Sequence, residues 1–198
     1  MALLPDGTFL VSERPGRLRR IAATGQVSPP LAGVPSVHAR GQGGLLDVVL
    51  DPEFAHNRRL WLSYAEPGPD DTAGTAVATA RLDGERLSGL RVIYRQQPKL
   101  GGDQHFGARI AFDGQGHVFI SQGERNQKAL AQDLSVLQGK LVRLNLDGSL
   151  PPDNPFAGRA DRARKSSATA TATARGWRSI RAPGDCGKAS MARAAAMS

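Results

Sequence analysis

Two short clusters of residues could together form a site for chemistry. Residues 41–47 read Gly-Gln-Gly-Gly-Leu-Leu-Asp, and residues 104–109 read Gln-His-Phe-Gly-Ala-Arg. Each cluster places a polar side chain beside glycine, which lets a ligand approach the backbone closely. Histidine ordinarily titrates near neutrality, so His105 is the natural proton acceptor of such a site. The pattern predicts half of a site built from two turns. On the residues alone, however, a histidine in this setting is more often an ordinary turn residue than a base, and Gln42 would be a loop amide.

The net charge is distributed unevenly along the chain. The formal charge is +8, but residues 157–198 hold nine Lys and Arg side chains against Asp161 and Asp185. Residues 1–156 carry 17 basic and 16 acidic side chains and are nearly neutral. This part offers no electrostatic footprint for nucleic acid, so a nucleic-acid partner is not expected.

Cysteine and hydropathy patterns say little about the cellular compartment. The only cysteine is Cys186, so residues 1–158 have no disulfide or thiolate framework. No run approaches the roughly 18–20 apolar residues of a membrane helix, and membrane insertion is not expected. The first residues lack the basic segment of a secretory signal and begin within a strand and turn. Either a cytoplasmic protein or a secreted protein whose true start is missing fits this pattern.

Internal repeats predict the architecture. Residues 4–21, 51–84 and 112–148 each combine an Asp-Gly or Asp-Pro turn with two short β-rich runs, the first ending in Ser or Tyr. This is repeated hairpin chemistry, typical of four-stranded β-propeller blades. The expected fold is therefore all-β, with about three blades of a larger ring, since fewer than four blades cannot close. Only residues 127–138 favour helix, as a turn or two inserted in the third repeat.

The residues also resemble a known family, the soluble quinoprotein sugar dehydrogenases, also called glucose/sorbosone dehydrogenases, and among them the bacterial aldose sugar dehydrogenases. The resemblance runs in order from about residue 2 to residue 156. It rests on Leu4-Pro5-Asp6-Gly7, Ser12-Glu13-Arg14-Pro15-Gly16-Arg17-Leu18, residues 41–47, Asp51-Pro52-Glu53-Phe54, His105-Phe106-Gly107, Ala131-Gln132-Asp133, Gly139-Lys140-Leu141 and Asp153-Asn154-Pro155-Phe156.

The resemblance implies a six-bladed propeller that oxidises the anomeric carbon of aldoses such as glucose, with hydride transfer to pyrroloquinoline quinone. It implies that His105 is the catalytic base, that Gln42 contacts the quinone and the sugar, and that Gln104 contacts the substrate. It also implies a calcium ion, an external electron acceptor and a periplasmic or secreted location. Arg125 and Asn126 look like the family's Arg-Asn cofactor pair, but they lie in the wrong blade and are not assigned to it.

No metal ligand is assigned within this chain. His38, His56 and His117 share no metal-ligand spacing and are expected to be surface or strand residues. Asp70 and Asp71 are expected in an exposed turn. The calcium ligands implied by the resemblance belong to a Glu-His-Gly-Pro-Arg-Gly-Gly-Asp-Glu motif, which this chain does not show.

Residues 159–198 form a low-complexity basic tail that departs from the family, whereas residues 1–158 form the partial propeller. One interpretation is genuine disorder. A second is translation out of frame, through a frameshift in the gene or a sequencing error. Alanine codons begin GC and threonine codons begin AC, so a shifted frame lets residues 167–173 encode the family's Tyr-Gly-His-Arg-Asn motif. The same shift lets residues 188–198 encode the Glu-His-Gly-Pro-Arg-Gly-Gly-Asp-Glu motif.

Three functions therefore stay open at the level of sequence. The chain is a fragment of a sugar dehydrogenase, an inactive remnant that cannot hold quinone or calcium, or a non-catalytic propeller module that binds a partner. The sequence alone does not indicate the preferred sugar or the oligomeric state.

Overall fold

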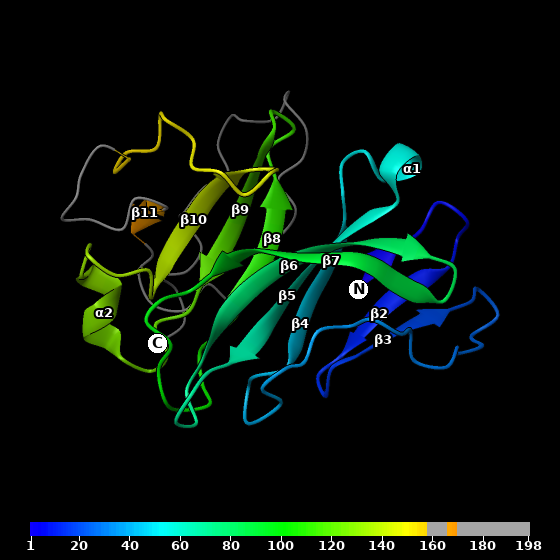
Figure 1. Cartoon of the computed structure of the whole chain (residues 1–198), viewed down its shortest axis with the longest axis horizontal. Helices are drawn as coiled ribbons and strands as arrows, with labels where there is room; N and C mark the ends of the chain where they lie inside the picture. The colour runs from blue at the N-terminus through cyan, green and yellow to red at the C-terminus, as the bar shows by residue number, and fades with distance from the viewer. Residues whose placement is uncertain (158–165, 170–198) are drawn as a thin grey trace, which may run out of the picture.

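Three antiparallel sheets lie side by side in the computed structural model, which describes residues 1–157 and 166–169 (Figure 1). They follow one another along the chain, and each is built from consecutive strands, as the repeats predicted. The sheets are adjacent blades of a β-propeller, which confirms the expected fold class. Residues 158–165 and 170–198, which include most of the predicted tail, lie outside the described residues.

The first sheet contains β1 (Ala2–Leu3), β2 (Phe9–Glu13) and β3 (Arg17–Ile21) in that order. Its first turn is closed by Asp6, whose Oδ1 accepts hydrogen bonds from the Thr8 amide at 3.0 Å and the Thr8 hydroxyl at 2.7 Å. Gly7 follows with a φ of 82°, a conformation that glycine adopts without steric cost. The Asp-Gly signal in the sequence therefore marks a real turn between strands.

The second sheet is larger than its sequence repeat. It contains β4 (Leu45–Leu50), β5 (Arg59–Pro67), β6 (Ala73–Asp83) and β7 (Arg86–Arg95), with the short helix α1 (Phe54–Asn57) between β4 and β5. The repeat at residues 51–84 covers only the two middle strands. The flanking strand β4 begins inside the first cluster, directly after Gly44, so this sheet positions that cluster.

The third sheet contains β8 (Gly107–Phe112), β9 (His117–Gln122), β10 (Lys140–Asn145) and β11 (Ser166–Thr169). Helix α2 (Lys128–Gln132) lies between β9 and β10, where the sequence predicted an inserted helical turn. Strand β11 lies within the predicted tail, yet its backbone pairs antiparallel with β10 and completes the sheet. The second cluster, residues 104–109, leads directly into β8.

The apolar core lies between the blades. One buried cluster joins the first and second sheets and includes Leu10, Leu18 and Leu62, and a second joins the second and third sheets. In the second cluster, the fully buried Trp61 makes an edge contact with Phe112 at 5.3 Å and donates its indole N–H to Asp51 at 2.8 Å. Since each blade buries its faces against its neighbours, the ends of the strands are held in fixed relative positions.

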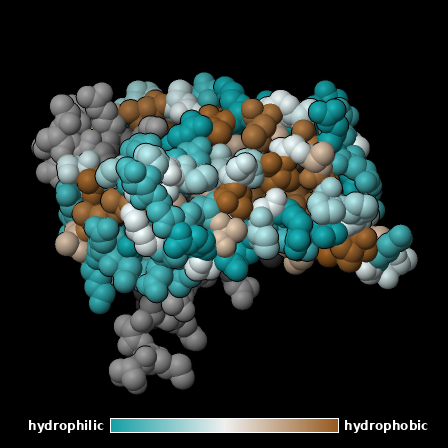
Figure 2. Space-filling model, turned by 60° about the horizontal axis from the view of Figure 1, so that its bottom comes forward, coloured by the Kyte–Doolittle hydropathy of each residue, from teal (hydrophilic) through white to brown (hydrophobic). Residues whose placement is uncertain are grey.

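On the face drawn in Figure 2, hydrophobic residues occur in separate small groups among hydrophilic ones. Within the described residues, no helix is long and apolar enough to cross a membrane.

Candidate active site

The two glycine clusters meet in space. The side-chain Oε1 of Gln42 accepts a hydrogen bond from the backbone N–H of His105 at 3.0 Å. The backbone N–H of Gln42 donates to the backbone carbonyl of Asp103 at 2.8 Å. A Cβ added at Gly41 would lie 2.5 Å from the Asp103 side chain, so the close approach requires glycine. The structure thus joins the turns before β4 and before β8, as the sequence predicted.

His105 adopts an unusual backbone conformation at this junction. Its φ is 51°, in the left-handed region, and this backbone conformation costs a residue other than glycine about 1–3 kcal/mol. Its carbonyl lies so close to Gly123 that a Cβ there would be 1.8 Å from the oxygen. The backbone is therefore held by its surroundings, and the imidazole side chain is 21% exposed.

A buried carboxylate holds the ring of His105. Glu124 is 3% exposed in its side chain, and its Oε1 is hydrogen-bonded to Nδ1 of His105. An Nδ1–H donor to this carboxylate leaves Nε2 as the proton-accepting nitrogen of a neutral ring. The other oxygen, Oε2, is buried without a hydrogen-bond partner among the described residues. The pair therefore has the composition of a general base and the group that orients it.

Glu124 was missed by the sequence interpretation. It lies 19 residues after His105 and two residues after the end of β9, and the two meet because β8 pairs antiparallel with β9. In that pairing Gly107 lies opposite Gln122, so the residues just outside each strand end become neighbours. The available signal was the Gly-Glu-Arg-Asn segment, in which only the arginine and asparagine were considered.

Arg125 supports the loop that carries the base. Its guanidinium donates to the carbonyl of Gln104 at 2.9 Å and also to the carbonyls of Gly102 and Ala73. It lies 3.8 Å from the centroid of the Phe106 ring, a cation–π distance. Burial lowers the pKa of Arg125, and the charge of Asp103 opposes this effect. Arg125 thus holds the loop that precedes and includes the base.

The two glutamines lie at the surface around His105. Gln42 and Gln104 are exposed, and Gln104 lines a hollow of about 400 Å³ with Gly102, Asp103, Arg125 and Asn126. Amide side chains offer both donors and acceptors, which suits hydroxyl and carbonyl groups of a small polar ligand. The three predicted site residues are therefore brought together.

His38 departs from its expected surface or strand position, because it is a buried loop residue. It is 8% exposed, and its Nε2 is 2.9 Å from Oδ1 of Asp103. This hydrogen bond is the main reason why the pKa of Asp103 lies below its ordinary value, with Arg40 adding to the effect. His38 therefore anchors the segment that precedes His105.

The remaining singled-out residues lie away from the base. His56 is an exposed residue of α1, and His117 on β9 is 2.7 Å from the Asp113 carboxylate. Asp70 and Asp71 lie in an exposed turn, as predicted, and Asp71 pairs with Arg40.

Comparison with known proteins identifies the lineage of this arrangement. The family model described as glucose/sorbosone dehydrogenase matches residues 1–171. The chain belongs to the glucose/sorbosone dehydrogenase family.

Relatives in the glucose/sorbosone dehydrogenase family include aldose sugar dehydrogenases from two bacteria. The chain is 54% identical over 159 residues to the aldose sugar dehydrogenase of Escherichia coli strain K12, covering 79% of this chain and 43% of that protein. The crystal structure of soluble aldose sugar dehydrogenase from E. coli in its apo form matches with a TM-score of 0.81 and 50% identity, covering 83% of this chain and 48% of that one. The PQQ-bound aldose sugar dehydrogenase of Streptomyces coelicolor matches with a TM-score of 0.70 and 33% identity, covering 79% and 47%. The chain therefore spans less than half the length of these relatives.

The described residues of this family member fit the two expected cofactors differently. Gln42, Gln104 and the partly exposed ring of His105 form a polar rim suited to a quinone and a sugar. For calcium, residues 1–157 and 166–169 contain no group of three or more His, Cys, Asp or Glu side chains placed to hold an ion. No calcium ligand is therefore assigned within this part of the chain.

Proposed function

We propose that the protein to which residues 1–157 belong oxidises the anomeric carbon of aldose sugars in a reaction that uses pyrroloquinoline quinone. The observation that carries the proposal is the His105–Glu124 pair, joined to Gln42, in a chain 54% identical to an aldose sugar dehydrogenase. The choice of pyrroloquinoline quinone as the cofactor rests on the relatives, because the S. coelicolor structure is a PQQ-bound form.

His105 takes the proton in this proposal. Nε2 removes the proton of the anomeric hydroxyl while a hydride, carrying two electrons, leaves the same carbon, and the sugar becomes a lactone. When bound, pyrroloquinoline quinone would supply the hydride acceptor. An external electron acceptor is also part of the proposal, as the final recipient of the two electrons. Glu124 faces the opposite ring nitrogen and stabilises the imidazolium that forms.

Gln42 and Gln104 orient the reactants. Gln42 fixes the backbone of His105 through its Oε1, which leaves its side-chain NH₂ group to donate to the quinone or the sugar. Gln104 is the residue directly before the base, so a sugar hydroxyl in contact with its side chain would also lie near His105. Both glutamines act by positioning, which converts a loose encounter into an oriented one.

Several features of the whole protein are part of this proposal. Calcium is expected to be held by residues beyond 157, and the complete protein is expected to be periplasmic or secreted. Residues 159–198 are proposed to be read out of frame, which would make the present chain an inactive fragment of an active lineage. Sequencing the gene tests the last point: one uninterrupted frame, with no propeller sequence in another frame downstream, would contradict it.

A chimera tests the proposed activity directly. Residues 1–157 replace the matching segment of the E. coli relative, and dye reduction is measured with glucose, quinone and calcium. The expected result is sugar-dependent dye reduction that requires added quinone, while the 198-residue chain under the same conditions gives none. A chimera that folds and binds quinone but does not oxidise any aldose would contradict the proposal.

A further inference from the structure

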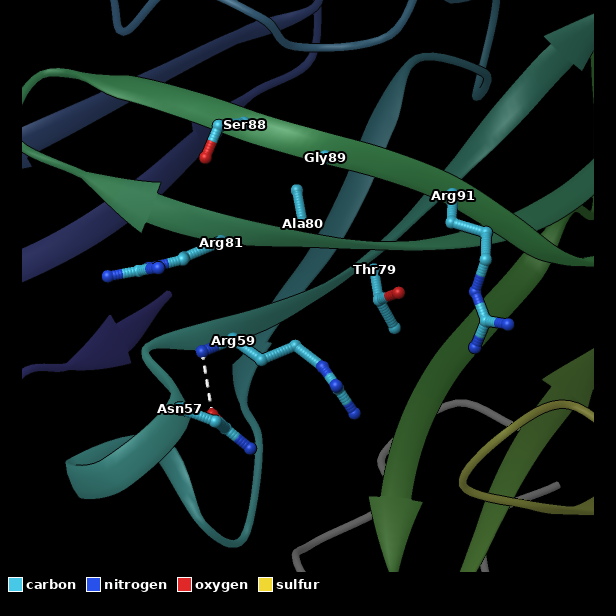
Figure 3. Close-up of a pocket in the computed structure, with 8 residues that line it drawn as sticks. All are labelled: Asn57, Arg59, Thr79, Ala80, Arg81, Ser88, Gly89 and Arg91. Atoms are coloured by element: carbon cyan, nitrogen blue, oxygen red, sulfur yellow. Dashed lines mark hydrogen bonds between the residues drawn. The ribbon is translucent and has the colours of Figure 1, made fainter.

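The arginines outside the candidate site differ in what their side chains contact. On the second sheet, three arginines line a hollow of about 500 Å³, which is shown in Figure 3. Arg81 extends away from Arg59 and Arg91 in this view, so the three side chains do not converge on one ligand. Arg14, in the turn between β2 and β3 of the first sheet, is different because its side chain contacts a loop of the candidate site.

Arg14 holds the loop before β4 on both sides of Gln42. Its Nη1 carries two N–H donors, which bond to the backbone carbonyls of Ala39 at 3.1 Å and Gly41 at 2.9 Å. The backbone carbonyl of Arg14 accepts a hydrogen bond from the amide of Leu45 at 3.0 Å. The first sheet is thereby joined to the residue directly before Gln42 and to the first residue of β4.

The same loop packs closely against Arg14 and against the ring of Phe106. A Cβ added at Gly44 would lie 2.0 Å from the Arg14 carbonyl oxygen, and one added at Gly43 would lie 3.2 Å from a ring carbon of Phe106. Gln42 directly precedes these two glycines. Contacts from the first sheet and from the segment before β8 therefore limit how this loop can move.

The side chain of Arg14 is bonded to this loop and not to a carboxylate. Arg17 and Arg19 both pair with Glu13, whereas Arg14 forms no ion pair within the described part of the chain. Among the described residues, no other group donates to the two carbonyls that Arg14 holds. Because Arg14 is exposed, its removal should loosen this loop without unfolding the sheets.

We propose that Arg14 is a positioning residue for the reaction proposed above and that it acts through Gln42. A fixed loop keeps Oε1 of Gln42 on the backbone N–H of His105 and leaves its NH₂ group to the reactants. This role rests on the proposed function of Gln42 and His105. It gives the first sheet a part in the site, although Arg14 itself is assigned no contact with sugar or quinone.

Hydrogen exchange of single amides, measured by NMR on the 198-residue chain, tests the positioning itself. We expect Arg14→Gln to speed exchange of the His105 amide, which donates to Gln42, by about tenfold or more. The amide of Ile120, at the centre of the third sheet, should exchange as in the parent chain. Arg17→Gln, which removes an exposed charge on the other side of the same turn, is the matched control and should leave the His105 amide unchanged. Unchanged exchange at His105 in the Arg14 variant, or equal acceleration throughout the sheets, would overturn the proposal.

Kinetics of the chimera test whether the position of Gln42 matters for the reaction. At saturating quinone, Arg14→Gln should lower kcat/KM for glucose by about tenfold or more, and Arg17→Gln should leave it unchanged. In a chimera that already carries Gln42→Ala, Arg14→Gln should have no further effect, because both changes remove the same interaction. Effects that multiply would show that Arg14 acts independently of Gln42 and would overturn the proposal. An inactive parent chimera would contradict the proposed function alone, since exchange of the His105 amide still decides whether Arg14 positions Gln42.

Discussion

At the scale of single residues, the candidate site depends on three contacts around His105. The Gln42 side chain holds its backbone, Glu124 holds its ring, and Arg125 holds the carbonyl of the residue before it. Each contact joins segments at least 19 residues apart, so none follows from local sequence. Together they fix one imidazole nitrogen toward the protein and leave the other for a ligand.

Replacing Glu124 tests whether the carboxylate serves the base. In the chimera, Glu124→Gln keeps the size of the side chain but removes the charge that stabilises the imidazolium. We expect kcat to fall by about 10²–10⁴-fold, the usual contribution of general base catalysis, while quinone binding is retained. Glu85→Gln, at an exposed position outside the site, is the control and should leave kcat unchanged. If the Glu124 variant keeps the parent's kcat, the carboxylate has no role in proton transfer.

The Asp103 carboxylate makes stability depend on pH. Its hydrogen bond with His38 lowers its folded pKa below the ordinary value of 3.8. A lowered carboxyl pKa stabilises the folded state above 3.8, and this contribution disappears as the pH falls through the folded value. The thermal midpoint of the 198-residue chain should therefore exceed that of Asp103→Asn at neutral pH, and the two should converge in acid. A difference that stays constant down to acid pH would contradict this assignment.

At the scale of elements, the site is positioned by the crossing of the β8–β9 strand ends with the turn before β4. Gly123 follows β9, and its amide donates to the Phe106 carbonyl at 3.0 Å. The backbone of His105 passes directly over it. This crossing brings Glu124 and His105 together, so it should be intolerant of added volume.

Gly123→Ala tests the crossing. The new Cβ would lie 1.8 Å from the His105 carbonyl oxygen, which forces the backbones apart. We expect a loss of at least about 2 kcal/mol in the free energy of unfolding, measured by denaturant titration. Gly101→Ala is the matched control, since a Cβ at that position would have no neighbour within 4 Å, and it should change stability by less than about 0.5 kcal/mol. Equal effects from both substitutions would show that the crossing is not tightly packed.

The sequence predicted elements better than their boundaries. The Asp-Gly turns and short β-rich runs were sufficient to predict three blades, because that chemistry is local. Strand β7 was not predicted, because most of its residues are exposed or half-buried and its sequence shows no clear alternation of apolar side chains. Glu124 was not predicted as a site residue, because it becomes a neighbour of His105 only through the pairing of β8 with β9. His38 was misassigned because its burial depends on a loop packing against Phe106 and Asp103.

At the scale of the whole molecule, the chain supplies three neighbouring blades that match part of the propeller of its relatives. The described blades hold the proposed base, its carboxylate and two glutamines, whereas they contain no group of acidic and histidine side chains suited to a metal. The chain spans less than half of its aldose sugar dehydrogenase relatives. The remaining cofactor contacts of the proposed enzyme must therefore come from outside the described residues.

The most direct test of the account is His105→Gln in the chimera of residues 1–157 with the E. coli relative. Glutamine can still form hydrogen bonds but cannot accept the proton of the anomeric hydroxyl at neutral pH. We predict that glucose-dependent dye reduction falls at least about 100-fold, while quinone binding, measured by absorbance of the bound cofactor, is retained. A variant that binds quinone and still oxidises glucose at the parent's rate would contradict the assignment of His105 as the base.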